Sequence, residues 1–343
     1  NWTRFWNARL PQPFLPRRFM KTTGGTLFMV LIPAVTFLVL SLLYWVRGRD
    51  PRLHTRPGAV TRLSADLTAD VAGTLVDERT EPRDLLAALI DAARRGAVQL
   101  THEAAETGEV SRVLVRAAGP FDRLPPSQKA VASLLAHSAD EGPAAFSIEQ
   151  GVPRTVVRQA RDAVQGECAR LGFFRQNPAL ERRVYNAIGL ALLLASVVVS
   201  AGVMSSFWMA KVGLGLFLAA LACFLFAPLM PQRTWRGALE NSAARAYAAP
   251  LRTLAPPKLD TDRRQEEFER GLPYAIAFRF RKEWINDFAE EGVLTPAWWQ
   301  TAAPAAAADA GPRPLMETRE AFIQTLSILS AALGESPARS SGG

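Results

Sequence analysis

Three long stretches without a charged residue constrain the fold of this chain more than any other feature. They cover residues 24–46, 187–208 and 212–230. The longest has 23 residues, and as a helix rising about 1.5 Å per residue it reaches about 34 Å, enough to cross a hydrocarbon core of about 30 Å. In water these stretches would expose a large apolar surface. We therefore predict an α-helical membrane protein with three transmembrane helices.

The stretches differ in how they connect to the rest of the chain. The first is a span and not a cleavable signal peptide, because it is long and is followed by Arg47, Arg49 and Arg52 instead of a small-residue cleavage site. Only a few residues around Lys211 separate the second and third, which predicts a helical hairpin. Small residues in the second stretch would allow close helix packing: Ala191, Ala195, Ser196 and Ser200.

Basic residues near the ends of the stretches predict the orientation of the chain, which has a formal net charge of +8. Six flank one side: Arg4, Arg9, Arg17, Arg18, Lys21 and Lys211. Twelve flank the other: Arg47, Arg49, Arg52, Arg56, Arg62, Arg170, Arg175, Arg182, Arg183, Arg233, Arg236 and Arg245. Since basic residues favour the cytoplasmic side, we predict a bacterial inner-membrane protein with its N-terminus outside and its middle and C-terminal segments in the cytoplasm.

Residues 1–23 form a basic N-terminal segment without a single acid. Its aromatic residues are Trp2, Phe5, Trp6, Phe14 and Phe19. Such a segment can bind the membrane surface, or it can be a linker after an upstream domain, and both interpretations stay open. Because the sequence starts at Asn1 and not at Met, we expect that an upstream part was cleaved, removed or left out.

Residues 47–183 have the pattern of a soluble α+β domain. A helix is predicted after Pro82, with an apolar face that ends at Gly96. Alternating valines and leucines around Thr107-Gly108 then predict a β-hairpin, with Val98, Leu100, Val113 and Val115 on one face. A second helix from Pro125, a short strand at Phe146 and Ile148, and a long helix from Pro153 or Arg154 to Gly172 follow. Helices combined with a hairpin predict winged-helix-like cytosolic modules.

The charges on these helices do not favour nucleic acid, although many winged helices bind DNA. A DNA-reading helix normally carries a basic face. The long helix offsets its arginines with Asp162 and Glu167, and the first offsets Arg94 and Arg95 with acids of its own. We interpret both as solvated faces, which favours a structural role or contact with another protein.

Residues 231–300 are predicted to form a cytosolic helical segment, and residues 301–343 an Ala-rich, mostly flexible tail that contains one short helix at 322–333. The first helix of the segment would place Leu239, Ala243 and Tyr247 on one face. A charged helix over 261–270 is expected to end at Gly271, so that Pro273 opens the next helix. That helix carries an aromatic stripe, typical of a packed core face, with docking onto the bilayer or a partner as the alternative.

Residues with catalytic chemistry are few. The three histidines His54, His102 and His137 form no metalloprotease motif, and Cys168 and Cys223 suffice for no metal cluster or disulfide framework. The sequence contains no P-loop and no G-x-S-x-G elbow. We predict no catalytic, cofactor or metal site and no enzyme activity. The partner or packing candidates are Arg233, Trp235, Leu272, Pro273, Tyr274, Ile276, Phe280, Trp284 and Phe288.

Several of these motifs together resemble a known family, the YciQ-like predicted membrane proteins with domain of unknown function 2207. The resemblance covers about residues 24–300. It is carried by Asp66 with Ala72-Gly73-Thr74-Leu75, by Leu89-Ile90-Asp91-Ala92-Ala93-Arg94-Arg95-Gly96, by Arg233-Thr234 with Gly237, and by Phe268-Glu269 with Leu272-Pro273-Tyr274-Ala275-Ile276-Ala277, Trp284 and Phe288. The resemblance implies no established reaction. It implies a LemA-like membrane protein as a possible partner, and a signal peptide and β-sandwich before the first span that this sequence does not contain.

Three functions stay open at this stage. The first is a membrane-anchored scaffold that binds partner membrane proteins, with the lipid bilayer as its solvent and a homo-oligomer as a further possibility. The second is a subunit of an oligomeric transport or channel assembly, although the three stretches lack the ionisable residues that such pathways usually keep. The third is a membrane-tethered winged-helix regulator.

Overall fold

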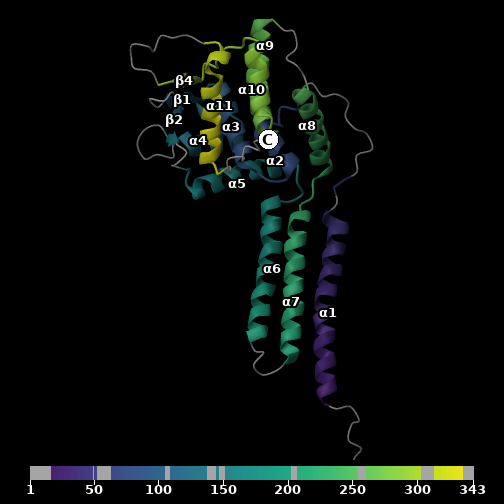
Figure 1. The fold of residues 1–343 in the computed structure, drawn as a ribbon. Helices are drawn as coiled ribbons and strands as arrows, with labels where there is room; N and C mark the ends of the chain where they lie inside the picture. Colours follow the sequence, from purple (N-terminus) through teal and green to yellow (C-terminus); the bar gives the residue numbers. More distant parts are fainter. Residues whose placement is uncertain are drawn as a thin grey trace, which may run out of the picture. The chain divides into compact units, whose positions relative to one another are not determined.

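The computed structural model describes residues 17–48, 50–51, 63–104, 109–136, 144–146, 151–201, 207–253, 260–302 and 313–334 (Figure 1). Several sequence predictions lie outside this part of the chain. They include the first 16 residues of the basic N-terminal segment, the Thr107-Gly108 turn, Ile148, and most of the Ala-rich stretch and the last residues of the predicted tail.

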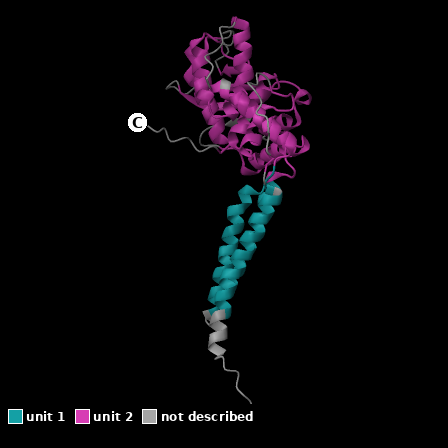
Figure 2. Cartoon of the chain, turned by 90° about the vertical axis from the view of Figure 1, so that its right-hand side faces the viewer, with its two compact units in different colours: residues 1–49, 179–232 teal, residues 50–178, 233–343 magenta. Residues whose placement is uncertain are grey.

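The chain divides into two compact units, and each unit combines segments that are far apart in the sequence (Figure 2). Unit 1 comprises residues 1–49 and 179–232, and unit 2 comprises residues 50–178 and 233–343. The middle and C-terminal segments, which the sequence shows only as separate stretches, therefore belong to one compact unit.

Unit 1 consists of long apolar helices. Helix α1 spans Arg17–Leu43 and continues as the π-helical turn η1 at Tyr44–Gly48. Helix α6 spans Pro178–Ala201, and α7 spans Phe207–Phe226 before the 3₁₀ turn η4 at Ala227–Leu229. Three helices of the described chain are long and apolar enough to cross a membrane, namely Gly24–Val46, Pro178–Ala201 and Trp208–Leu229. The three-helix prediction is thus confirmed in number and position.

The boundaries of the second span differ from the prediction of 187–208. Helix α6 starts nine residues earlier, because the polar residues before Ala187 are good helix formers and extend the helix beyond its apolar part. It ends at Ala201, and Trp208 belongs to the next helix, α7. A run of apolar residues does not reveal where one helix stops and the next begins.

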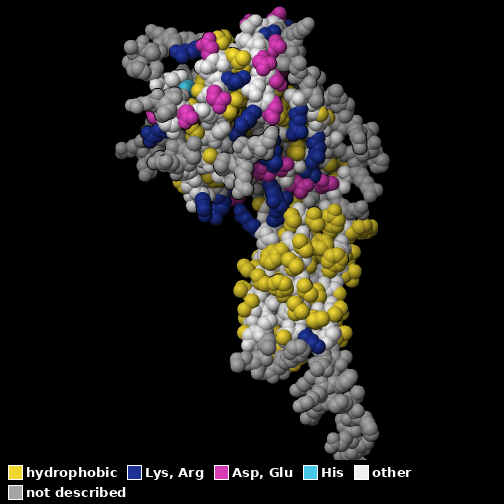
Figure 3. All heavy atoms as spheres, in the orientation of Figure 1, with side chains coloured by type: hydrophobic (Ala, Val, Ile, Leu, Met, Phe, Trp, Pro, Cys, Tyr) yellow, Lys and Arg dark blue, Asp and Glu magenta, His cyan; other side chains and the backbone are white. Residues whose placement is uncertain are grey.

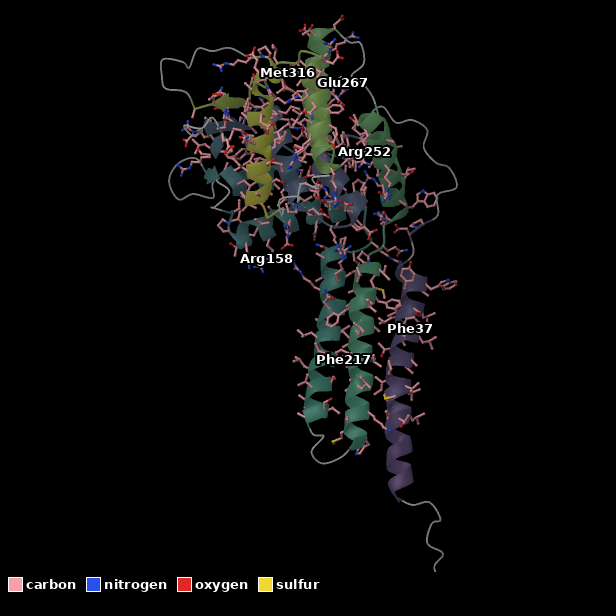
Figure 4. The ribbon with its side chains drawn as sticks, viewed as in Figure 1. Phe37, Arg158, Phe217, Arg252, Glu267 and Met316 are labelled. Atoms are coloured by element: carbon pink, nitrogen blue, oxygen red, sulfur yellow. The ribbon has the colours of Figure 1, made fainter. Side chains whose placement is uncertain are left out.

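The sequence predicted that a set of small residues allows close packing of the two hairpin helices, and the structure agrees for part of that set. The buried Ser196 hydroxyl of α6 donates a hydrogen bond of 2.8 Å to the carbonyl of Gly213 in α7. Ala191 of the same set is exposed instead. On the other side of α7, Phe226 packs edge-on against Phe37 of α1, which Figure 4 labels, and Lys211 donates to the Thr26 hydroxyl. Hydrophobic side chains cover most of this unit's visible surface (Figure 3).

The first half of unit 2 has the hairpin and, apart from α2 and the short turn η2, the helices that the sequence predicted. Its helices are α2 (Ala69–Asp77), α3 (Pro82–Arg94), the 3₁₀ turn η2 (Phe121–Arg123), α4 (Pro126–Ala136) and α5 (Arg154–Arg170). Gly96 and Gly172 have positive φ angles of 77° and 73°, which confirms them as the residues that end α3 and α5. Helix α2 was not predicted from periodicity, and its residues are nearly all buried.

The strands form one sheet in the order β3-β2-β1-β4. Strands β1 (Val98–Ala104) and β2 (Val110–Ala117) pair antiparallel as the predicted hairpin, with Leu100 opposite Val115. Strand β3 (Ala144–Phe146) adds to β2, and β4 (Trp299–Thr301), from the far end of the chain, pairs parallel with β1. The described elements are helices joined to a hairpin, but the winged-helix assignment itself stays a prediction.

The C-terminal helices differ from the prediction in where they break. Helix α8 spans Trp235–Thr253, α9 spans Thr261–Ala277 and α10 spans Arg281–Glu290. Helix α9 does not end at Gly271, and Pro273 lies inside it instead of opening a new helix. The role of Gly271 is close packing, because a Cβ there would overlap the indole ring of Trp284. The break comes at Arg279, which has a positive φ of 69°. The backbone hydrogen bonds around this residue have the pattern of a helix end.

The predicted aromatic stripe is therefore divided between two helices. Ile276 lies on α9, Phe280 caps α10, and Trp284 and Phe288 lie on α10. All four side chains are nonetheless buried in one core, where the rings of Trp284 and Phe288 lie 4.6 Å apart. The packed-core interpretation is confirmed, although the continuous helix on which it was based is wrong.

The last helix is longer than predicted and belongs to the core. Helix α11 spans Leu315–Ala332, seven residues more at its start than the apolar stretch suggested. Its side chains Leu315, Phe322 and Leu326 are buried without exposure, and Phe322 packs against both Trp298 and Trp299. This part of the predicted flexible tail is ordered because it completes the core of unit 2.

Candidate functional site

A buried arginine joins two parts of unit 2 that follow directly after membrane spans. We call Arg233, Asp50, Glu78 and the carbonyl groups of Leu75 and Val76 the Arg233 cluster. The Arg233 Nη1 atom lies 2.6 Å from an Asp50 carboxylate oxygen and 2.7 Å from a Glu78 carboxylate oxygen. Its Nε and Nη2 atoms donate to the Leu75 carbonyl at 3.2 and 2.8 Å, and Nη2 also donates to the Val76 carbonyl at 3.1 Å.

The end of helix α2 explains why an arginine is bound there. The last four carbonyls of a helix have no partner within the helix, and its C-terminus carries a partial negative charge. Leu75 and Val76 belong to this last turn, and Glu78 follows with a positive φ of 57°. The planar guanidinium supplies donors to both carbonyls while it pairs with two carboxylates, which a lysine could not do with the same geometry.

A second contact fixes the start of α8 beside the end of α5. The Thr234 hydroxyl donates to the Gly172 carbonyl at 2.5 Å and accepts from the Gly237 N–H at 3.0 Å, so it caps the helix. A Cβ at Gly237 would overlap the Phe173 carbonyl oxygen, so the close approach requires glycine. Arg236 donates to the Leu171 carbonyl at 2.9 Å and lies over the Phe173 ring.

These two contacts bring together the three places where the chain passes between the units. Asp50, Phe173 with Phe174, and Arg233 with Thr234 all belong to unit 2, and each lies within a few residues of the boundary to unit 1. Phe174 also forms an isolated β-bridge with Arg233. The segments of unit 2 next to all three spans are thus bonded to one another.

A group of polar side chains from helices α2, α3 and α4 is buried in the core of unit 2. The Gln128 side-chain amide donates to Asp91 at 2.7 Å and contacts Asp70 at 3.5 Å. Asp91 also pairs with Arg94 and Arg95, which lie at the end of the same helix. Burial raises the pKa of Asp70, and the nearby polar side chains of Ser127 and Thr68 oppose that rise. Burial thereby favours the neutral form of the Asp70 carboxyl.

Two other buried groups have perturbed pKa values for the same physical reason. Burial raises the pKa of Asp84 well above its ordinary value, and its partial relief is the hydrogen bond of 2.8 Å that it accepts from the Glu81 N–H. Burial also raises the pKa of the Cys168 thiol well above its ordinary value, which keeps it an unreactive thiol at neutral pH. Among the described residues, no three His, Cys, Asp or Glu side chains lie close enough together to hold a metal ion.

His102, for which the sequence predicted no catalytic or metal-binding role, lies in the sheet of unit 2. Its ring stacks on Trp299 at 4.4 Å, and its Nδ1 atom lies 2.9 Å from the Gln300 carbonyl. Burial lowers its pKa, which favours the neutral ring. This contact ties β1 to β4.

Most of the sequence-derived candidates prove to be internal. Arg233, Leu272, Ile276, Phe280, Trp284 and Phe288 are buried, Pro273 is buried in α9, and the Tyr274 hydroxyl donates to the Leu67 carbonyl at 2.9 Å. These side chains therefore pack in the interior of unit 2. Trp235 is the exception, with 56% of its surface exposed.

The exposed apolar side chains of unit 2 gather in two places that the sequence did not reveal. Leu239, 48% exposed, follows Trp235 by one helical turn on α8. It was predicted to share a face with Tyr247, but Tyr247 is buried and Leu239 is not. Leu294 and Met316, 38% and 51% exposed, form the second place, where two loops meet through the bridge between Leu294 and Pro314. No pattern in the sequence distinguishes these side chains from core residues.

The resemblance seen in the sequence can be compared with this structure. No curated protein matches the chain, and no solved structure matches it either. The motif residues of the resemblance occupy the centre of unit 2, in α2, α3, α9 and α10 and at the Arg233 cluster. Residues 62–288, more than half of the chain, match the family model described as "Predicted membrane protein (DUF2207) C-terminal domain", and the chain therefore belongs to this family of predicted membrane proteins.

Proposed function

We propose that this protein is a membrane-anchored scaffold, without enzyme activity of its own, whose unit 2 binds a partner membrane protein. The observation that carries the proposal is the exposed pair Leu294 and Met316, whose chain segments are joined by a backbone bridge. Exposed apolar side chains that are held next to each other can mark the site where a partner protein binds. We call this pair the Leu294–Met316 patch.

The patch is held rigidly by backbone hydrogen bonds. The Leu315 N–H donates to the Val293 carbonyl at 2.8 Å, and the Thr295 N–H donates to the Arg313 carbonyl at 2.8 Å. The Gln265 side chain accepts from the Leu294 N–H at 3.0 Å and donates to its carbonyl at 3.2 Å. Because the backbone is fixed, little conformational entropy would be lost on binding.

The composition of the patch also suits a protein partner. Methionine is flexible and polarisable and adapts to apolar surfaces of different shape. Arg264 and Glu291, which pair across the adjoining loop, provide a charged rim. The membrane spans favour a partner in the same bilayer, and the family resemblance suggests a LemA-like membrane protein. With the orientation inferred from basic residues, unit 2 would meet that partner on the cytoplasmic side of the inner membrane.

Purification from its native membrane in mild detergent tests this proposal. We expect the full chain to bring down a membrane protein in fixed stoichiometry. The double substitution Leu294→Asp with Met316→Asp should remove that protein while the variant stays folded, because both side chains are already partly in water. Gln300→Asp, at another exposed position, is the matched control and should retain it.

Two results would count against a scaffold. One is wild-type protein that purifies without a stoichiometric partner. The other is a partner that the Leu294→Asp, Met316→Asp variant retains as well as the wild type does, because the binding surface would then lie elsewhere.

A further inference from the structure

Helix α8 presents a large aromatic side chain to the outside at its very first residue. Trp235 is 56% exposed and Leu239, one turn later on the same face, is 48% exposed. Burial of both in a non-aqueous environment would be favourable, at about 25 cal/mol per Å² of apolar surface. We propose that the first two turns of α8 lie in the interfacial layer of the bilayer, with Trp235 and Leu239 directed into it.

Chain length limits how far Trp235 can be from the membrane. The third span ends at Leu229, so five residues lie between it and Trp235, which makes six steps along the chain. At about 3.3–3.6 Å per residue, even a fully extended connection reaches only about 20 Å. The bilayer interface begins where the span ends, so Trp235 is confined to its neighbourhood by this connection alone.

The other two spans impose the same limit through hydrogen bonds within unit 2. Thr234, directly before Trp235, is bonded to Gly172 and Phe173, and the helix of the second span begins at Pro178. Arg233, one residue earlier, pairs with Asp50, four residues after the first span ends at Val46. Three short chain segments therefore converge on the start of α8. No other exposed apolar side chain in the described part of unit 2 is bound to the spans by so little chain.

The chemistry of this face suits the bilayer interface. Tryptophan is enriched at that depth because its ring is apolar and its indole N–H is polar, and leucine fills the apolar side. Arg236 and Arg170 are both exposed beside it, where they can approach lipid phosphates.

The acids around this face decide which lipid surface it fits. Asp66 pairs with Arg236, Glu167 pairs with Arg170, and Glu240 accepts from Ser64 nearby. The charges therefore nearly balance, so the face fits the interface of a bilayer in general and does not require anionic lipid.

Depth measurements on the purified full chain in phosphatidylcholine nanodiscs test the inference. A fluorescent probe is attached in one variant at Leu239→Cys and in the other at Met316→Cys. The two native side chains have nearly the same exposure, 48% and 51%, and Met316, which Figure 4 labels, is the second residue of α11, far along the chain from every span. The native Cys168 and Cys223 are buried, and unlabelled wild type measures their background.

We expect nitroxide lipids labelled near the headgroup to quench the probe at position 239 several-fold more strongly than the probe at position 316. A water-soluble quencher should show the reverse order. Equal quenching at both positions, or weak lipid quenching at 239, would overturn the proposal. Since nanodiscs with purified protein contain no partner, the result does not depend on whether the Leu294–Met316 patch binds one.

Discussion

Replacement of Arg233 by methionine should destabilise unit 2 far more than the loss of an ordinary surface charge. Methionine keeps most of the apolar volume of the side chain but removes every donor of the guanidinium. The change therefore separates hydrogen bonding and charge from packing.

The magnitude follows from what the Arg233 cluster loses. Arg233 is only 6% exposed, and its removal leaves the buried carbonyls of Leu75 and Val76 without their donors. An unsatisfied buried polar group costs about 1–3 kcal/mol, and the loss of one partner from a buried ion pair costs about 3–5 kcal/mol. Asp50 and Glu78 are partly exposed and can regain water, which reduces the cost. We therefore expect a loss of about 3 kcal/mol in the free energy of unfolding.

Thermal unfolding in detergent, followed by intrinsic tryptophan fluorescence, measures this loss. For a unit of this size, Tm changes by about 2–4 °C per kcal/mol, so Arg233→Met should lower Tm by about 6–12 °C. The Tm of Arg233→Lys should lie between those of the wild type and of Arg233→Met, because an ammonium keeps the charge but cannot bond both carbonyls and both carboxylates. Arg245→Met, on the following helix α8, is the matched control, because Arg245 is exposed and its side chain donates to Asn241 of the same helix.

The control should stay within about 0.5 kcal/mol of the wild type, as surface substitutions usually do. If Arg233→Met also unfolded within two or so degrees of the wild type, the Arg233 cluster would not hold unit 2 together, and the role assigned to it would be wrong.

Two further changes test the interior of unit 2. Gly237→Ala should lower Tm strongly because its Cβ would overlap the Phe173 carbonyl oxygen, whereas Gly166→Ala, in the open middle of α5, should raise stability by about 0.5–1 kcal/mol. Equal Tm values for the two variants would contradict the close packing. Asp70→Asn should stabilise the protein, and more so at pH 7 than at pH 4. Because burial raises the pKa of Asp70, the contribution of this carboxyl to stability is greatest at low pH and falls as the pH rises from its ordinary pKa through the raised one. Asparagine cannot ionise and can still bond Gln128. The measurement is Tm against pH, and a pH-independent difference between Asp70→Asn and wild type would refute it.

Sequence patterns predicted the local elements of unit 2 well where one physical signal decided them. Gly96 and Gly172 mark the ends of α3 and α5 because a left-handed residue is needed there. Alternation around Leu100 and Val115 predicted the hairpin because one face of the sheet is buried. Gly271 and Pro273 misled, because there the glycine serves a tertiary contact with Trp284, which no local signal can reveal.

The candidate site shows the same division. Arg233 was selected from its motif, but its partners Asp50 and Glu78 lie more than 150 residues earlier in the chain, and nothing in the spacing connects them. The Asp70–Gln128–Asp91 group was missed for the same reason, since its members belong to three different helices. Trp235 and Leu239 are apolar residue types that are common in protein cores, and only the packing of α8 places their side chains on the surface of unit 2.

By itself, the sequence determined that the chain has three helices long and apolar enough to cross a membrane, because the cost of hydrating long uncharged stretches depends on composition alone. It also determined most helices and the hairpin of unit 2, because periodicity and helix-terminating residues are local signals that depend on a few neighbouring residues. Only the tertiary structure decided that residues 50–178 and 233–343 share one core, that Arg233 closes it, and that Trp235, Leu239, Leu294 and Met316 stay outside. Those outcomes depend on which distant segments pack together, and burial is a property of that packing and not of the residue.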